Sequence, residues 1–317
     1  MKLVSYSLFG NQKIYKTGLL HNIEIAKKLL PDWKIRIYFC SKVDKKFIDL
    51  CKNSNTEIII KDRNYKYDPM LWRMLPMEEN HDAVIIRDVD TRIWDRDKRL
   101  IDDWLKSDFK FHVARENLGS DWPIMAGIWG GKKPNLKIKK NFNKWIKKEA
   151  RTKNSYINDQ AFLSKFIYPI IRHDLLVYSD HVVMDCENNV KSIPGGQDFY
   201  KGKRIMIGMP VIDDFFEEDK NLIDDEYFQS QKISKYDERI NHWHSEEENI
   251  VPDKPKKMTP LYKYTNPFLN IFVLIFDITF KKKLNIFKIL FIFFWNKVLR
   301  KFINLKFKNH NLSKYYK

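Results

Sequence analysis

Short apolar runs and helically spaced apolar residues alternate along the first half of the chain. Strands are predicted where the runs are short and end in polar residues, at 2–8, 35–40 and 57–60. Between them, apolar residues recur with a helical period over 19–30 and 47–51. Residues 9–17 are expected to form a polar loop. This alternation predicts an α/β fold whose ligands bind at the carboxyl ends of the strands.

A fourth buried strand is predicted at Ala83–Ile86, where four apolar residues end abruptly at Arg87-Asp88-Val89-Asp90. The chain bends where a strand ends, so the carboxylates of Asp88 and Asp90 can approach one ion. Oxygen ligands of this kind suit Mg²⁺ or Mn²⁺. The alternative is that both acids simply end the strand and pair with Arg87 and Arg92.

Further elements are predicted beyond these acids. Helices are expected at 67–77 and 96–107, and a strand at 109–114. The glycine-rich segment 125–131 allows its backbone to come close to a ligand. Asn158-Asp159-Gln160 opens a later helix, where an Asp or Asn serves as a cap.

The chain also carries a resemblance to a known family. The run Arg87-Asp88-Val89-Asp90-Thr91-Arg92, followed by Asp102–Leu105 and Ala126–Gly130, resembles GT-A glycosyltransferases that build bacterial capsules and surface polysaccharides. The resemblance begins at Ser5–Gly10 and ends near Asn158–Leu163, about the first half of the chain. It implies an α/β fold of the GT-A (Rossmann-like) nucleotide-diphospho-sugar transferase type, with a mixed central sheet.

The resemblance also implies an activity and the residues that carry it. The metal, Mn²⁺ or Mg²⁺, is expected on Asp88 and Asp90. The nucleotide-sugar donor, expected to be a UDP-sugar, is expected to contact Ser7, Tyr15, Arg73, Arg87, Asp88, Arg92 and Gly127. The candidate catalytic residues are Asp159, Gln160 and Asp121.

Two donor residues have open alternatives. The ring of Tyr15 is suited to stacking on a nucleotide base, or it packs on the following helix. Arg73 forms a planar fork onto phosphate, or an ion pair that holds Asp88 in place.

The acceptor cannot be carried over from the family. Residues 116–123 depart from its pattern, which usually has a His-containing stretch here, although Glu116 and Asp121 remain possible general bases. Inversion at the sugar needs a carboxylate base, such as Asp121 or Asp159. Retention would instead place Gln160 or a backbone carbonyl against the reacting face, so the stereochemistry stays open.

The charge of the chain is concentrated near its C-terminus. The formal net charge is +17, and eleven Lys and Arg residues without one acid follow Asp277, which leaves +6 for residues 1–280. Apolar runs at 267–280 and 284–299 are each short for a bilayer span, so residues 267–317 are expected to form amphipathic helices on an anionic membrane surface. A Pro/Lys-rich linker at 251–266 would separate them from a catalytic domain at 1–250.

Other sequence features bear on the cellular location of the protein and on its partners. The three cysteines have an odd count and no metal-type spacing, which indicates a reduced cytosol. Together with the cationic tail, this predicts a peripheral place on the inner face of the cell membrane. No nucleic-acid-binding motif occurs. His173, His181 and the pair His242/His244 lack zinc-type spacing, although one of them is a candidate to complete the metal shell.

These observations predict a metal-dependent glycosyltransferase that moves a sugar from a nucleotide-sugar donor to a bacterial surface glycan or a lipid-linked acceptor. Two alternatives remain: a non-catalytic membrane-surface adaptor with the same fold, and a metal-dependent phosphotransferase or hydrolase that uses the same acids.

Overall fold

The computed structural model describes residues 1–63, 68–116, 122–145, 147, 158–200, 203–209 and 256–258. All of them belong to the first of two units into which the chain divides, Met1–Pro260. The predicted membrane tail at 267–317 lies outside the described residues, as does most of the predicted linker. In the ranges that are described, no helix is both long and apolar enough to cross a bilayer.

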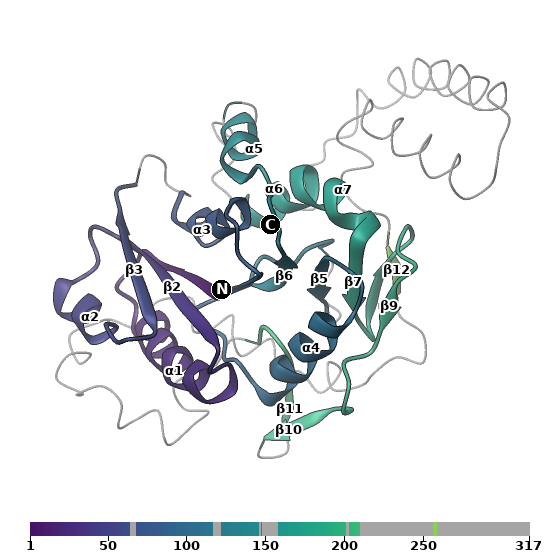
Figure 1. Cartoon of the computed structure of the whole chain (residues 1–317), viewed down its shortest axis with the longest axis horizontal. Helices are drawn as coiled ribbons and strands as arrows, with labels where there is room; N and C mark the ends of the chain where they lie inside the picture. Colours follow the sequence, from purple (N-terminus) through teal and green to yellow (C-terminus); the bar gives the residue numbers. More distant parts are fainter. Residues whose placement is uncertain are drawn as a thin grey trace, which may run out of the picture. The chain divides into compact units, whose positions relative to one another are not determined.

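A mixed eight-stranded sheet is the centre of the described part (Figure 1). Its strand order is β3-β2-β1-β4-β6-β5-β7-β9, in which β6 runs antiparallel to β4 and β5 and the other neighbours are parallel. These strands are β1 (Lys2–Leu8), β2 (Trp33–Cys40), β3 (Thr56–Lys61), β4 (Ala83–Arg87), β5 (Phe111–Ala114), β6 (Ile128–Lys132), β7 (Leu175–Tyr178) and β9 (Val190–Lys191). Two small sheets pair β10 (Asp198–Tyr200) with β11 (Lys203–Ile205) and β12 (Lys256–Met258) with β8 (Val182–Met184).

Helices cover both faces of the sheet. Figure 1 shows α1 and α4 on one side and α3, α5, α6 and α7 on the other. The helices are α1 (Lys13–Leu29), α2 (Lys45–Leu50), α3 (Asp68–Trp72), α4 (Asp95–Lys106), α5 (Ile138–Trp145), α6 (Asn158–Phe162) and α7 (Tyr168–Ile171). Shorter helical turns are η1 (Leu75–Glu78), η3 (Leu163–Ile167) and η4 (Arg172–Asp174).

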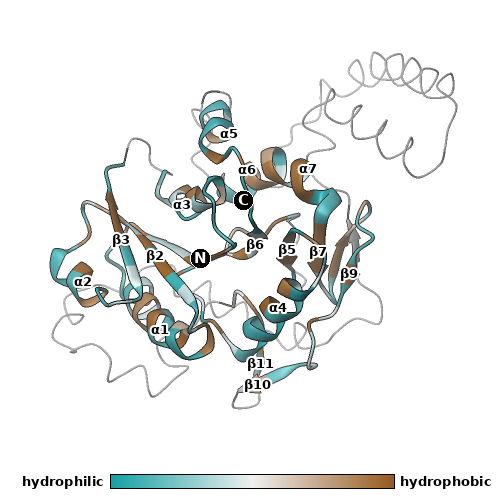
Figure 2. Ribbon diagram, in the orientation of Figure 1, coloured by the Kyte–Doolittle hydropathy of each residue, from teal (hydrophilic) through white to brown (hydrophobic). Residues whose placement is uncertain are grey.

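The structure confirms the predicted α/β class with a mixed central sheet. Strand β4 is buried along its whole length, as its apolar run predicts for a strand covered on both faces. In Figure 2, β5 and β7 are brown, whereas the neighbouring helix α4 is mostly teal with some brown. One boundary prediction was wrong: α1 begins at Lys13, so the second half of the expected loop at 9–17 is helical.

Close packing around β6 requires a residue without a side chain. The ring of His112 on β5 packs against that of Trp104 of α4, tilted by 52° with ring centroids 4.4 Å apart. A Cβ on Gly130 would lie 2.6 Å from Nε2 of His112 and 2.7 Å from the backbone oxygen of Val84. Backbone cannot retreat easily in the middle of a sheet, so only glycine fits here.

We therefore predict that Gly130→Ala lowers the free energy of unfolding by about 1–3 kcal/mol, because the added methyl overpacks the sheet. Urea denaturation measures the change. Gly10→Ala is the control, since a Cβ there meets nothing within 4 Å, and it should shift stability by less than about 0.5 kcal/mol. Equal stability of the two variants would contradict this account of the sheet.

Candidate active site at the carboxyl edge of the sheet

Asp88 and Asp90 lie directly beyond the carboxyl end of β4. Because β6 is antiparallel and pairs Ile128 with Arg87, the residues that precede β6 reach the same edge. A Cβ on Gly127 would lie 1.9 Å from Oδ2 of Asp88 and 3.0 Å from its backbone nitrogen. The backbone of Gly127 is therefore packed directly against Asp88, as the glycine-rich pattern predicts.

Arg73 joins Asp88 to a second carboxylate. Its Nη1 lies 2.5 Å from Oδ1 of Asp88, and its Nη2 lies 3.1 Å from Oδ2 of Asp159. The Arg73 and Asp159 side chains are 7% and 6% exposed, whereas that of Asp88 is 34% exposed. Of the two alternatives for Arg73, the structure shows the ion pair that holds Asp88, and phosphate binding stays a prediction.

Asp159 stands at the beginning of α6 beside Gln160. Its Oδ1 accepts a hydrogen bond from the backbone nitrogen of the next residue, Gln160, at 2.9 Å. An N-cap accepts from a nitrogen two or three residues further on, so the predicted capping role stays a prediction. Burial raises the pKa of Asp159 to about 6, against the opposing effect of Arg73. The Gln160 side chain is partly exposed at the same place.

Asp90 carries the strongest electrostatic perturbation of the acid pair. Desolvation, and then the neighbouring charge of Asp88, raise its pKa to about 7, while Arg73 and Arg92 act in the opposite direction. Two like charges at this spacing resist ionising together. A cation that approached both carboxylates would remove that resistance.

Helix α1 fixes the loop that carries these acids. Nδ2 of Asn22 donates to the carbonyl oxygen of Thr91 at 2.6 Å, and Oδ1 of Asn22 accepts from the backbone nitrogen of Ile93 at 3.1 Å. A Cβ on Gly18, one turn earlier, would lie 2.0 Å from the carbonyl oxygen of Val89. Gly18 and Asn22 fall within the family resemblance, but their sequence positions gave no sign that they hold this loop.

Arg87 and Arg92 point inward. Nε of Arg87 lies 3.1 Å from Oδ1 of Asp97, and both side chains are almost completely buried. Arg92 is 2% exposed and lies against Gly18, where a Cβ would come 2.8 Å from its Nη1. Donor binding by these two arginines stays a prediction, to which their positions add no support.

The other residues predicted to bind the nucleotide-sugar donor or to act in catalysis lie along the same edge or outside the described residues. Ser7 lies near the carboxyl end of β1, and its buried hydroxyl has no hydrogen-bond partner among the residues described. Tyr15 lies in the first turn of α1, partly buried against the core, which is the packing alternative considered for it. Asp121 lies outside the described residues.

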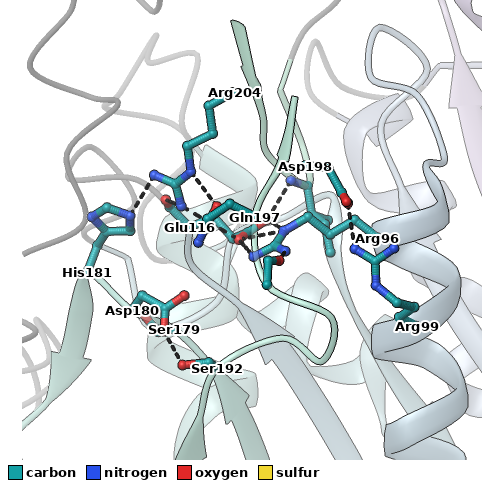
Figure 3. A network of polar contacts seen from close by, with 12 residues as sticks. Arg96, Arg99, Glu116, Ser179, Asp180, His181, Ser192, Gln197, Asp198 and Arg204 are labelled. Carbon is teal, nitrogen blue, oxygen red and sulfur yellow. Dashed lines mark hydrogen bonds and ion pairs between the residues drawn. The ribbon is translucent and has the colours of Figure 1, made fainter. Parts of the chain in front are cut away.

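A second polar cluster lies beyond β5 and β7 (Figure 3). Glu116 accepts from Nε of Arg96 at 2.9 Å and from the backbone nitrogen of Ile207 at 2.8 Å. Arg204 donates to Nε2 of His181 at 2.9 Å and to Oε1 of Gln197 at 2.6 Å.

This cluster changes the interpretation of two residues. Glu116 is 3% exposed and its carboxylate is engaged, so the geometry does not support it as a general base. His181 is fully buried against Arg204, which does not suit a metal ligand. His242 and His244 lie outside the described residues.

Comparisons with known proteins add the following. The sequence matches no family model and no curated protein sequence. Among solved structures, the galactosyltransferase LgtC in complex with donor and acceptor sugar analogues is 14% identical, with a TM-score of 0.40 over 58% of this chain and 76% of LgtC. A glycosyltransferase involved in glycosylation of the major capsid of PBCV-1 is 13% identical, with a TM-score of 0.40 over 58% of this chain and 83% of its own. The glycosyltransferase GlyE of Streptococcus pneumoniae is 14% identical, with a TM-score of 0.37 over 56% and 44% of the two chains. Likeness at this level carries no argument about activity.

We predict that Asn22→Ala loosens the acid loop and weakens Mn²⁺ binding about 10–100-fold, as expected for a residue that orients ligands without touching the ion. Isothermal titration measures the affinity. Asn55→Ala is the control, since Nδ2 of Asn55 donates to the carbonyl oxygen of Trp33 at 2.9 Å, at the opposite end of β2. It should cost a similar stability and leave Mn²⁺ affinity unchanged, so equal affinities in the two variants would refute this role for Asn22.

The buried histidine of the second cluster predicts an acid-sensitive fold. Burial, and then the charge of Arg204, lower the pKa of His181 from 6.5 to about 4. Below pH 6.5 the unfolded chain therefore takes up a proton that the folded chain refuses, and stability falls until about pH 4. Relative to the wild type, His181→Gln should lose about 1 kcal/mol less between pH 7.5 and pH 5.5.

Chemical denaturation at the two pH values tests this prediction. Glutamine keeps an oxygen acceptor for Arg204 but does not titrate. His173→Gln, at an exposed histidine, is the control and should follow the wild-type pH dependence. Parallel pH curves for all three proteins would show that His181 does not titrate as expected.

Proposed function

We propose that the chain is a metal-dependent glycosyltransferase, which moves a sugar from a nucleotide-sugar donor, a UDP-sugar, to a bacterial surface glycan or a lipid-linked acceptor. One observation carries this proposal. Two carboxylates one residue apart, Asp88 and Asp90, stand together at the carboxyl edge of a mixed α/β sheet, with the backbone of Gly127 packed against the first. In α/β sheets this edge is where ligands bind.

The residues present fit a hard divalent cation. Asp88 and Asp90 offer carboxylate oxygens, and Asp88 is partly exposed. Burial, and then the charge of Asp88, raise the pKa of Asp90, and a bound cation would oppose both effects. Among the described residues no group of three His, Cys, Asp or Glu side chains gathers as a metal site, so the donor's phosphate oxygens and water would complete the shell. When bound, Mn²⁺ or Mg²⁺ would neutralise charge that develops on the departing nucleoside diphosphate.

The chain's own residues would then position the sugar. Arg73 holds Asp88 and Asp159 on one guanidinium, so the metal-binding acid and the candidate catalytic acid share one anchor. Inversion assigns the base to Asp159 or Asp121. The pKa of about 6 suits Asp159 to accepting a proton near neutral pH, whereas its burial and its ion pair with Arg73 count against that role, as they do for Glu116. Retention assigns the reacting face to Gln160, whose side chain is partly exposed beside Asp159, or to a backbone carbonyl.

The proposal also places the enzyme at the inner surface of the membrane. Residues 267–317 carry the cationic and apolar composition that suits an interfacial helix. This part of the proposal depends on sequence alone.

We predict that Asp90→Asn lowers Mn²⁺-dependent release of nucleoside diphosphate from the donor by about a hundredfold or more, because a neutral amide loses the charge that binds the ion. The donor is first found by a thermal-shift screen of nucleotide sugars with and without Mn²⁺, in which the bound donor raises the melting temperature.

Asp62→Asn is the matched control, an exposed acid just beyond the carboxyl end of β3. It should keep full activity. A wild-type protein without metal-dependent turnover would favour the adaptor, whereas products that lack a glycosylated acceptor would favour a phosphotransferase or hydrolase.

A further inference from the structure

Four exposed lysines lie on helix α5 or close to its two ends. Lys137, Lys140, Lys144 and Lys147, here called the α5 lysine stripe, follow one another at spacings of three, four and three residues and are all exposed. Lys140 and Lys144 share one face of α5, whereas Lys137 directly precedes the helix and Lys147 follows its last residue, Trp145, by two positions. Figure 2 shows α5 as largely hydrophilic on its outer side.

The opposite face of α5 is anchored in the protein. Trp145 is 2% exposed, and its ring lies 5.9 Å from that of Phe162 on α6, centroid to centroid. At the other end, the backbone nitrogen of Leu136 donates to the carbonyl oxygen of Met77 at 2.6 Å. The α5 lysine stripe is therefore carried by a fixed platform between η1 and α6.

The chain segment that carries the stripe is rich in lysine, between the flanking acids Asp121 and Glu149. Residues 122–148 contain eight lysines, no arginine and no Asp or Glu. Within the described residues none of the four stripe lysines forms an ion pair, whereas the neighbouring Lys139 lies 3.8 Å from Oε2 of Glu78. Among the described residues, the stripe is therefore a cationic surface whose charges are not paired.

The helix compensates only part of the charge of the stripe. Lys137 and Lys140 lie at the beginning of the helix and oppose its dipole, which Glu78 offsets in part because its Oε1 accepts from the backbone nitrogen of Lys139 at 2.8 Å. Lys144 lies in the last turn, where a positive charge favours the dipole. Like charges three and four residues apart also repel one another. A helix whose outer face served only solubility would mix both signs of charge.

We propose that the α5 lysine stripe docks the described unit on an anionic lipid surface, as an interaction distinct from that expected of the C-terminal tail. Lysine is a compact point charge on a long flexible stem, which suits diffuse attraction to a plane of headgroups. A specific glycan or phosphate site would instead use arginine forks or aromatic platforms around a concave pocket. This inference does not depend on the proposed sugar transfer.

The test compares two full-length variants that lose the same charge. The stripe variant carries Lys137→Gln, Lys140→Gln, Lys144→Gln and Lys147→Gln. The control variant carries Lys28→Gln, Lys42→Gln, Lys45→Gln and Lys46→Gln, all exposed lysines in or beside α1 and α2. Sedimentation with phosphatidylglycerol/phosphatidylcholine vesicles at about 0.1 M salt measures partitioning, and thermal denaturation confirms that both variants fold.

The stripe variant should partition at least about tenfold less than the wild type, and the control should stay within about threefold. Equal losses in both variants would show attraction by net charge alone and overturn the proposal. So would unchanged binding of the stripe variant, which would leave docking to the tail. The proposal would also be overturned if the stripe variant still bound vesicles but no longer bound a soluble polyanionic glycan. That result would favour a glycan as the partner of the stripe. Donor turnover without vesicles should be unchanged in both variants, so failure here leaves the proposed activity untouched.

Discussion

Repulsion between the neighbouring carboxylates Asp88 and Asp90 is the constraint around which this edge of the protein is arranged. The loop must hold both acids at one place, although burial and then the charge of Asp88 raise the cost of ionising Asp90. Arg73 and Arg92 supply positive charge from two directions, and Asn22 binds the loop through its backbone groups. The result is an acid pair kept in position with its charge only partly compensated, which is the condition under which a divalent cation binds well.

The sequence predicted the sheet well because its signal is local. A strand covered on both faces needs an unbroken apolar run, and Ala83–Ile86 has one, so β4 and the acids that follow it were placed correctly. The starts of helices were harder to predict than the strands. Residues 13–17 read as a polar loop, yet they form the first turns of α1, where tertiary contacts of Lys16 and Thr17 with the core outweigh weak periodicity.

Side-chain partners far apart in sequence were beyond the reach of pattern analysis. The sequence left two alternatives for Arg73. Only the fold shows that Asp88 and Asp159 both meet its guanidinium, although Asp159 is 86 residues away in the sequence.

The lysines of α5 were missed for another reason, which is how the net charge was summed. Summing over residues 1–280 concealed the lysines of α5, because acids elsewhere cancel them, although a window over 122–148 would have shown them.

Two ion pairs on opposite faces of the sheet orient the chain where it leaves β4. Successive residues of a strand point to opposite sides, and Arg87 and Asp88 do so here. Arg87 binds Asp97 at the beginning of α4, on one side, and Asp88 binds Arg73, which follows α3, on the other. Asp97 in turn accepts from the backbone nitrogen of Trp94 at 3.0 Å, so the same carboxylate caps α4. A buried ion pair contributes little net stability once desolvation is counted, but it strongly disfavours any arrangement that leaves one partner alone. Rotation of the strand end would break both pairs and leave Arg87 and Asp97 buried without each other, which favours the observed direction of the acid loop.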